Sequence, residues 1–124
     1  MSKNYREITR SVSSSVGKLK ADLPEVISGF NALARSASKS GALDSKTKEL
    51  IALSLGVAAR CDACIGFHVQ ALIAHGATRL EVEEALGMAV YMGGGPSLMY
   101  AADALSAYEQ MLPATKSGET ATGG

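Results

Sequence analysis

Apolar residues recur at three- and four-residue steps along nearly the whole chain, and no other feature constrains its fold as strongly. Such spacing places apolar side chains on one face of an α-helix. Near the N-terminus the apolar positions are Tyr5, Ile8, Val12, Val16 and Leu19. The sequence contains no convincing alternating pattern of a β-strand, and 47% of its residues are apolar. We therefore predict an all-α domain.

Capping and helix-breaking residues divide this pattern into about six helices. We expect the first over about residues 4–19 and the second from Pro24 to about Leu33, because proline fits the first turn of a helix. The small polar run at 36–41 is typical of a loop. The other four helices are expected over about residues 46–59, 61–75, 78–93 and 96–108, and Thr78 with Glu81 predicts a capping box at the start of the fifth.

The third of these helices is apolar on nearly every face, which predicts a buried, central helix. At 124 residues the chain is long enough for one domain. We expect residues 1–112 to form it, with a single copy of the core helices. The Thr/Gly/Ser-rich segment 113–124 is predicted to be a disordered tail.

Charge and hydropathy exclude several classes of partner. The chain has 12 basic and 12 acidic residues and lacks a basic stripe, which argues against binding to nucleic acid. Its first residues lack the apolar segment of a secretory signal, and no apolar run reaches the ~18 residues of a membrane span. We expect a cytoplasmic protein, and in that compartment a close cysteine pair is more often catalytic or metal-binding than structural.

Both cysteines and one of the two histidines lie within residues 61–68. Cys64 is expected in the first turn of the fourth helix, where the helix dipole and free N–H groups favour a thiolate. Cys61 is then at the cap, within reach for a disulfide. His68 follows Cys64 by four residues, on the same helical face, and can accept its proton. The pattern indicates an activated nucleophile with an adjacent base.

Glu49 is the candidate third element of this site. It lies in the nearly all-apolar third helix, and the short connection at 59–60 predicts that this helix packs antiparallel to the fourth. A carboxylate in that interface needs a partner, and His68 is the natural candidate. Taken alone, Glu49 fits a surface position equally well.

Two other interpretations of the cysteine motif are open at this point. The cysteines could be ordinary buried residues, or they could bind zinc with His68 and His75. Structural zinc usually takes ligands from two separate segments, whereas all four would come here from one helix and its cap. His75 also precedes Gly76 and fits the C-terminal cap of the fourth helix.

Together Glu49, Cys61, Cys64 and His68 form the pattern E-x11-C-x2-C-x3-H. Over about residues 43–108 the chain resembles the thiol-dependent, AhpD-like (alkylhydroperoxidase) branch of the carboxymuconolactone decarboxylase family. The resemblance implies an all-α AhpD-like fold and an enzyme that reduces a hydroperoxide or a disulfide. It also implies a proton relay from Glu49 through His68 to Cys64, with Cys61 closing a disulfide that an external thiol reopens.

The same resemblance implies the partners. The thiol donor can be a lipoyl group and the physiological partner a peroxiredoxin, and no metal or other cofactor is implied. The short chain resembles smaller family members that assemble as hexamers more than the longer, trimeric AhpD.

This chain departs from AhpD at one position. AhpD has a histidine immediately before its second cysteine, whereas Asp62 and Ala63 separate the cysteines here. One proton carrier is therefore absent. Two alternatives to the thiol enzyme are a 4-carboxymuconolactone decarboxylase-like enzyme, which needs no cysteine pair, and a non-enzymatic redox-sensing oligomer.

Overall fold

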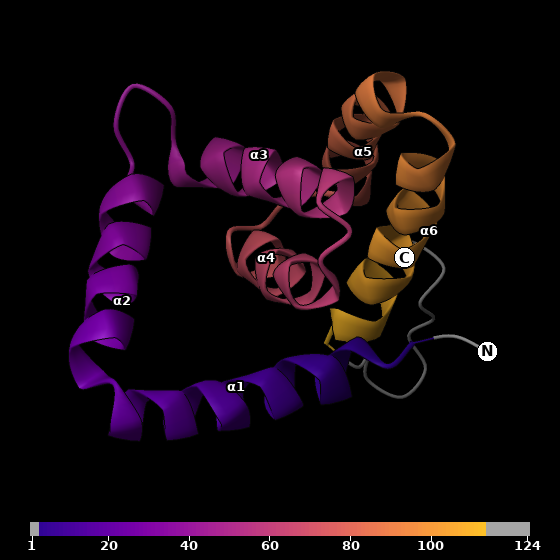
Figure 1. Ribbon diagram of the computed structural model, residues 1–124. Helices are drawn as coiled ribbons and strands as arrows, with labels where there is room; N and C mark the ends of the chain where they lie inside the picture. Colours follow the sequence, from indigo (N-terminus) through magenta and orange to yellow (C-terminus); the bar gives the residue numbers. More distant parts are fainter. Residues whose placement is uncertain (1–2, 114–124) are drawn as a thin grey trace.

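The computed structural model describes residues 3–113, and these residues form six α-helices and no β-strand (Figure 1). The prediction of an all-α fold is confirmed. The helices are α1 (Tyr5–Asp22), α2 (Pro24–Ser38), α3 (Ser45–Ala58), α4 (Asp62–Ala74), α5 (Arg79–Gly93) and α6 (Gly95–Met111). Of the tail predicted from residue 113 onward, residues 114–124 lie outside the described part of the chain.

Side-chain caps explain where several helices begin. Asn4 and Asp44 accept backbone N–H groups at the starts of α1 and α3, and Thr78 with Glu81 forms the predicted capping box of α5. One boundary differs from its prediction. α2 continues to Ser38, into the run expected to be a loop, and the Ser38 hydroxyl donates to the carbonyl of Ala34 one turn earlier.

The central helix is α4 rather than α3. Ile65, Val69 and Leu72 of α4 are fully buried, and α4 contacts α1, α3 and α6. The expectation that α3 is buried nearly all round is wrong, because Ile51 and Leu55 are 45% and 64% exposed. Its other face packs on α4, α5 and α6. The core consists of Tyr5, Leu53, Val57, Ile65, Val69, Leu72, Ala77, Val82, Leu86, Ala89, Ala101, Ala104, Ala107, Tyr108 and Met111.

Residues 16–38, which we call the arm, extend away from this bundle. Figure 1 shows α1 passing beneath α4 and α2 rising beside it toward the start of α3. None of the residues of α2 is buried, and this helix contacts only α1 and α3 among the described elements. Lys48 fixes its far end, because Nζ donates to the carbonyls of Ala37 and Lys39 at 3.0 and 2.6 Å.

Within residues 3–113, none of the helices is long and apolar enough to cross a membrane.

Candidate active site

The turn between α3 and α4 places the first cysteine. Arg60 has a φ of 57°, its N–H donates to the carbonyl of Val57, and the N–H of Cys61 donates to the carbonyl of Gly56. These two bonds form a Schellman motif, which ends α3 with a residue in the left-handed region. Because the turn is so short, Cys61 follows α3 directly and is also the N-cap of α4.

At this helix start the two sulfurs are joined. Cys61 and Cys64 form a disulfide, with their Cα atoms 5.2 Å apart. The backbone N–H of Cys64 donates to Sγ of Cys61 over 3.2 Å, so this sulfur takes the place of a capping oxygen. Once the disulfide is reduced, the positive end of the α4 dipole favours a thiolate at this helix start, where both sulfurs lie. Neither cysteine is fully buried.

A glycine brings α3 close to the second cysteine. Gly56 is buried, and a Cβ built on it would lie 3.1 Å from Cβ of Cys64. Glu49 precedes Gly56 by two helical turns and shares its face of α3. Because α3 and α4 run antiparallel, going back along α3 corresponds to going forward along α4. Glu49 therefore meets His68, one turn beyond Cys64.

The contact between Glu49 and His68 is short, and its carboxylate is largely shielded from water. Oε1 of Glu49 lies 2.6 Å from Nδ1 of His68, and the two side chains are 12% and 36% exposed. When Glu49 accepts this hydrogen bond, Nδ1 of His68 is the donor, and Nε2 is the ring nitrogen left to accept a proton. Among the described residues His68 is the only side chain that forms a hydrogen bond or ion pair with Glu49.

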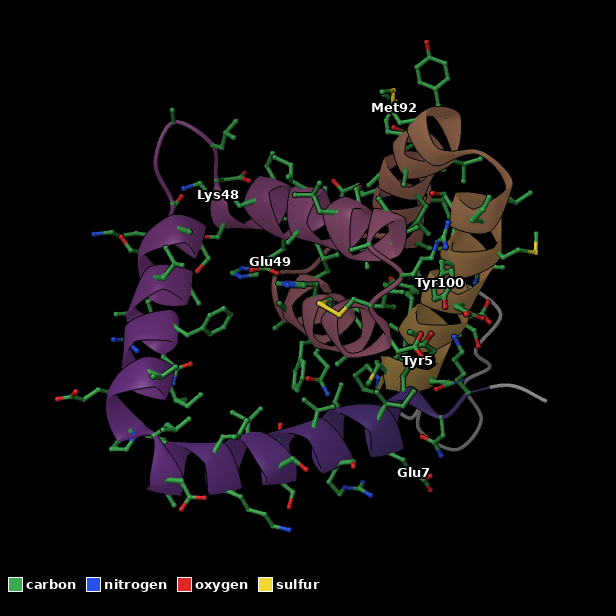
Figure 2. All side chains as sticks on the ribbon, in the orientation of Figure 1. Tyr5, Glu7, Lys48, Glu49, Met92 and Tyr100 are labelled. Atoms are coloured by element: carbon green, nitrogen blue, oxygen red, sulfur yellow. A yellow bond between two sulfur atoms is a disulfide. The ribbon has the colours of Figure 1, made fainter. Side chains whose placement is uncertain are left out.

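The four residues singled out by the sequence thus form two pairs. The cysteine pair lies at the start of α4, and Glu49 of α3 meets His68 one turn further along α4. Figure 2 shows the disulfide at the start of α4, and Glu49 on the side of α3 and α4 that faces α2. Within residues 3–113 no hydrogen bond joins His68 to either sulfur while the disulfide is closed. His75 cannot join the cysteines and His68 in a zinc site, because it is the C-cap at the opposite end of α4.

One charged group beside the cysteines is not predicted by the sequence. Lys3 donates to Asp62, which lies between them, at 2.9 Å, and to Asp103 of α6 at 2.8 Å. The hydrogen bonds to Asp103 and then Asp62 hold the pKa of Lys3 above its usual value. Its ammonium also lies 4.7 Å from the centre of the Tyr100 ring. Lys3 and Asp62 are 59 positions apart, so no local sequence pattern predicts that they form an ion pair.

Fold and site together define a class of protein, an all-α domain with a cysteine pair at a half-buried helix start and a carboxylate–imidazole pair one turn away. The model of the carboxymuconolactone decarboxylase family matches residues 24–107. The chain therefore belongs to the carboxymuconolactone decarboxylase family. An uncharacterised protein from Cupriavidus necator is 36% identical over 100 residues, which cover 81% of this chain and 88% of that protein.

Solved structures agree with this assignment. A carboxymuconolactone decarboxylase family protein from Legionella pneumophila is 55% identical and superimposes with a TM-score of 0.86, over 89% of this chain and 98% of its own. A family protein from Thermotoga maritima, for which a role in antioxidative response has been suggested, is 33% identical with a TM-score of 0.64. That superposition covers 68% of this chain and 87% of the other.

Proposed function

We propose that this protein is a thiol-dependent oxidoreductase that reduces a hydroperoxide or a disulfide through Cys61 and Cys64. The observation that carries the proposal is the disulfide at the N-terminus of α4, one helical turn from the Glu49–His68 pair. A cysteine pair that forms an adjacent disulfide can accept and return two electrons. A base held by a carboxylate can remove and return the proton that each step requires.

With a hydroperoxide, the cycle begins when His68 takes the proton of Cys64. The thiolate attacks the terminal peroxide oxygen, the O–O bond breaks, and the alkoxide leaves as an alcohol after taking the proton back from His68. Cys64 is then a sulfenic acid. The thiol of Cys61 attacks its sulfur, water leaves, and the Cys61–Cys64 disulfide closes. One peroxide has been reduced, and one cysteine pair has been oxidised.

Two equivalents of an external thiol complete the cycle. The first donor thiolate attacks one sulfur of the disulfide and forms a mixed disulfide, and the second releases the oxidised donor and restores both thiols. A dithiol such as a lipoyl group supplies both equivalents from one molecule, and a peroxiredoxin is a suitable protein partner. Such donors are reduced in the cytoplasm, which is the compartment we propose. We further propose a homo-oligomer, with a hexamer favoured over a trimer.

The test is turnover of a hydroperoxide by the purified protein with dihydrolipoamide as donor. The wild-type protein should consume peroxide and donor in a ratio of one to one, while Cys64→Ser and Cys61→Ser should each abolish turnover. Decarboxylation of a lactone acid that persists in Cys64→Ser would instead favour the decarboxylase alternative. A disulfide that changes the oligomer without turnover would favour a redox sensor.

A further inference from the structure

An open pocket lies between α1 and α4. Its volume is about 360 Å³, at the lower end of the range of small-ligand sites. One wall is a face of α1 and the other a face of α4, and the lining residues are Arg6, Thr9, Arg10, Ser13, Phe67 and Gln70. The four residues from α1 precede the segment 24–107 that matches the family, so most of this pocket lies outside the family pattern.

The two helices touch at the base of this pocket. A Cβ added to Gly66 of α4 would lie 2.5 Å from Cγ2 of Thr9, so α1 approaches α4 at a position that has no side chain. Thr9 is buried, and its hydroxyl donates to the carbonyl of Tyr5 within α1. Both walls are therefore helices in direct contact, which is the preformed kind of cavity that small ligands use.

The pocket carries two positive charges, and none of its described lining residues is acidic. Arg6 and Arg10 are four residues apart on one face of α1, where like charges repel each other and destabilise a helix. Within residues 3–113 neither arginine forms an ion pair with a carboxylate. An anion between the two guanidinium groups would remove this repulsion and accept hydrogen bonds from both.

The pocket also has hydrogen-bond donors to spare. Nε and Nη2 of Arg6 donate to the carbonyls of Gln110 and Leu112 at 3.1 and 3.4 Å, which fixes the guanidinium and leaves Nη1 for a ligand. The amide nitrogen of Gln70 has only long contacts, 3.5 Å to Oγ1 of Thr9 and 3.7 Å to a thioether sulfur. This amide can therefore turn toward an oxyanion at little cost.

The kind of donor favours a carboxylate over a phosphate. Phosphate sites commonly use free backbone N–H groups at a helix N-terminus. At the start of α1 the side chains of Gln110 and Asn4 already accept the N–H groups of Tyr5 and Glu7. The donors that remain are planar guanidinium and amide groups, which match a planar carboxylate.

We propose that this pocket binds the carboxylate of a small organic acid, with the body of the acid against the ring of Phe67. The carboxylate lies between the guanidinium groups of Arg6 and Arg10. The partly exposed ring of Phe67 supplies an apolar wall on the α4 side, where an aromatic or alkyl group can pack.

Phe67 also links this pocket to the redox site. Cys64, Phe67 and Gln70 follow one another along α4 at steps of three residues, so neighbouring members of this row lie side by side. An acid that crosses Phe67 therefore reaches Cys64. The substrate class is then a hydroperoxide that bears a carboxylate roughly 5–10 Å, or one to two helical turns, from its O–O group. This assignment of the substrate rests on the proposed function, whereas the carboxylate pocket does not.

Binding is tested by NMR titration of the full-length protein with 4-isopropylbenzoate, an acid that has no peroxide group. Wild type should bind it with roughly millimolar affinity or better. Arg10→Gln removes one guanidinium from the pocket, and Lys18→Gln makes the same charge change on α1 outside it. We expect Arg10→Gln to weaken binding about 5-fold or more and Lys18→Gln to leave it unchanged.

Three results would overturn the carboxylate pocket. The first is a wild-type protein that does not bind 4-isopropylbenzoate. The second is an equal loss of affinity in Arg10→Gln and Lys18→Gln, which would show only a general effect of charge. The third is tighter binding of phenyl phosphate than of 4-isopropylbenzoate by wild type, which would assign the pocket to phosphate.

The substrate class is tested by stopped-flow oxidation of the reduced protein with cumene hydroperoxide and with its 4-carboxy derivative. Each peroxide yields its alcohol and water while the cysteine pair closes its disulfide. Rates with N-acetylcysteine correct for the intrinsic reactivity of the two peroxides. The corrected rate constant should be at least about 5-fold higher for the 4-carboxy derivative in wild type and Lys18→Gln. In Arg10→Gln, or at high salt, this ratio should fall to about one.

Equal corrected rate constants in wild type would overturn the substrate assignment, as would a preference that persists in Arg10→Gln. A protein whose thiols neither peroxide oxidises would contradict the proposed function and the substrate assignment together. Binding of 4-isopropylbenzoate that depends on Arg10 would in that case still establish the carboxylate pocket.

Discussion

Gly56 of α3 lies directly against Cys64 of α4, so close that a single added carbon would be 3.1 Å from Cβ of the cysteine. The two helices are therefore closely packed at a cysteine of the disulfide. One turn further along α4, the same helix pair brings Glu49 to His68. The spacing between α3 and α4 therefore sets both halves of the site at once.

Replacing Gly56 should change the stability of the packing between α3 and α4. In Gly56→Ala we expect the crowding of Cys64 to cost about 1–3 kcal/mol, offset by about 1 kcal/mol of improved helix propensity. Gly87→Ala is the matched control, because Gly87 is also helical and has nothing within 4 Å of its added carbon. That control should gain stability. Urea unfolding of both variants measures the difference, and equal gains would show that α3 and α4 are not tightly packed at Cys64.

The carboxylate of Glu49 should matter for reactivity more than for folding. Glu49→Gln keeps an oxygen that accepts the Nδ1–H of His68 but removes the negative charge beside the ring. We expect the second-order rate of thiol oxidation by hydroperoxide to fall roughly 10²-fold, with a change in unfolding free energy below about 1 kcal/mol. Stopped-flow measurements across pH supply the rate and its pH profile. A wild-type rate and profile would remove Glu49 from the relay.

The charge of Lys3 should tune the redox potential of the cysteine pair. Lys3 balances Asp62 between the two cysteines, so Lys3→Met leaves a negative charge next to a thiolate that forms on reduction. Reduction becomes harder, and we expect the potential to become more negative by roughly 10–30 mV, since the ion pair is partly exposed. Equilibration with glutathione or dithiothreitol measures this potential. Adding Asp62→Asn should restore the wild-type value, and a potential unaffected by Lys3→Met would contradict the idea.

Stability should fall in acid because of two helix caps. Hydrogen bonds from Thr47 lower the pKa of Asp44 below 3.8, and the bond from Lys46, followed by that from Thr78, lowers the pKa of Glu81 below 4.5. In each case the folded state binds its proton less tightly than the unfolded state. The stabilisation is therefore complete above these unfolded values and disappears as pH falls through the lower, folded ones.

Asp44→Ala tests this contribution. At pH 7 the variant should unfold at lower urea concentration than wild type, and the difference should shrink as pH falls below 3.8. Asp44→Asn keeps a capping oxygen, so it should lose less at neutral pH. A difference in urea midpoint that is constant from pH 7 to pH 3 would show that the charge of Asp44 contributes nothing.

The sequence predicted what depends on local spacing. The capping box at Thr78 and the proline at the start of α2 are local signals, and both mark real helix starts. The Glu49–His68 contact was also within reach, because a short turn forces α3 and α4 to run antiparallel.

Features that depend on distant parts of the chain were not predicted. The Lys3–Asp62 ion pair joins residues far apart in sequence. Which face of α3 is exposed depends on the helices that pack against it. A helix that is apolar on nearly every face has the same sequence pattern whether it is fully buried or partly exposed. The arm illustrates the same limit, since the periodicity of α2 predicts a helix with an apolar face but does not say which surface covers that face.

The most direct test of the proposed redox cycle is a titration of the fully reduced protein with hydroperoxide, without any donor. The account predicts that each equivalent of peroxide removes both thiols of one chain, and that peptide mapping finds a single product, the Cys61–Cys64 disulfide. In Cys61→Ser the same titration should stop at a sulfenic acid on Cys64, which dimedone traps. If peroxide removes no thiols, or if oxidation yields only disulfides between chains, Cys61 and Cys64 are not the redox centre proposed here.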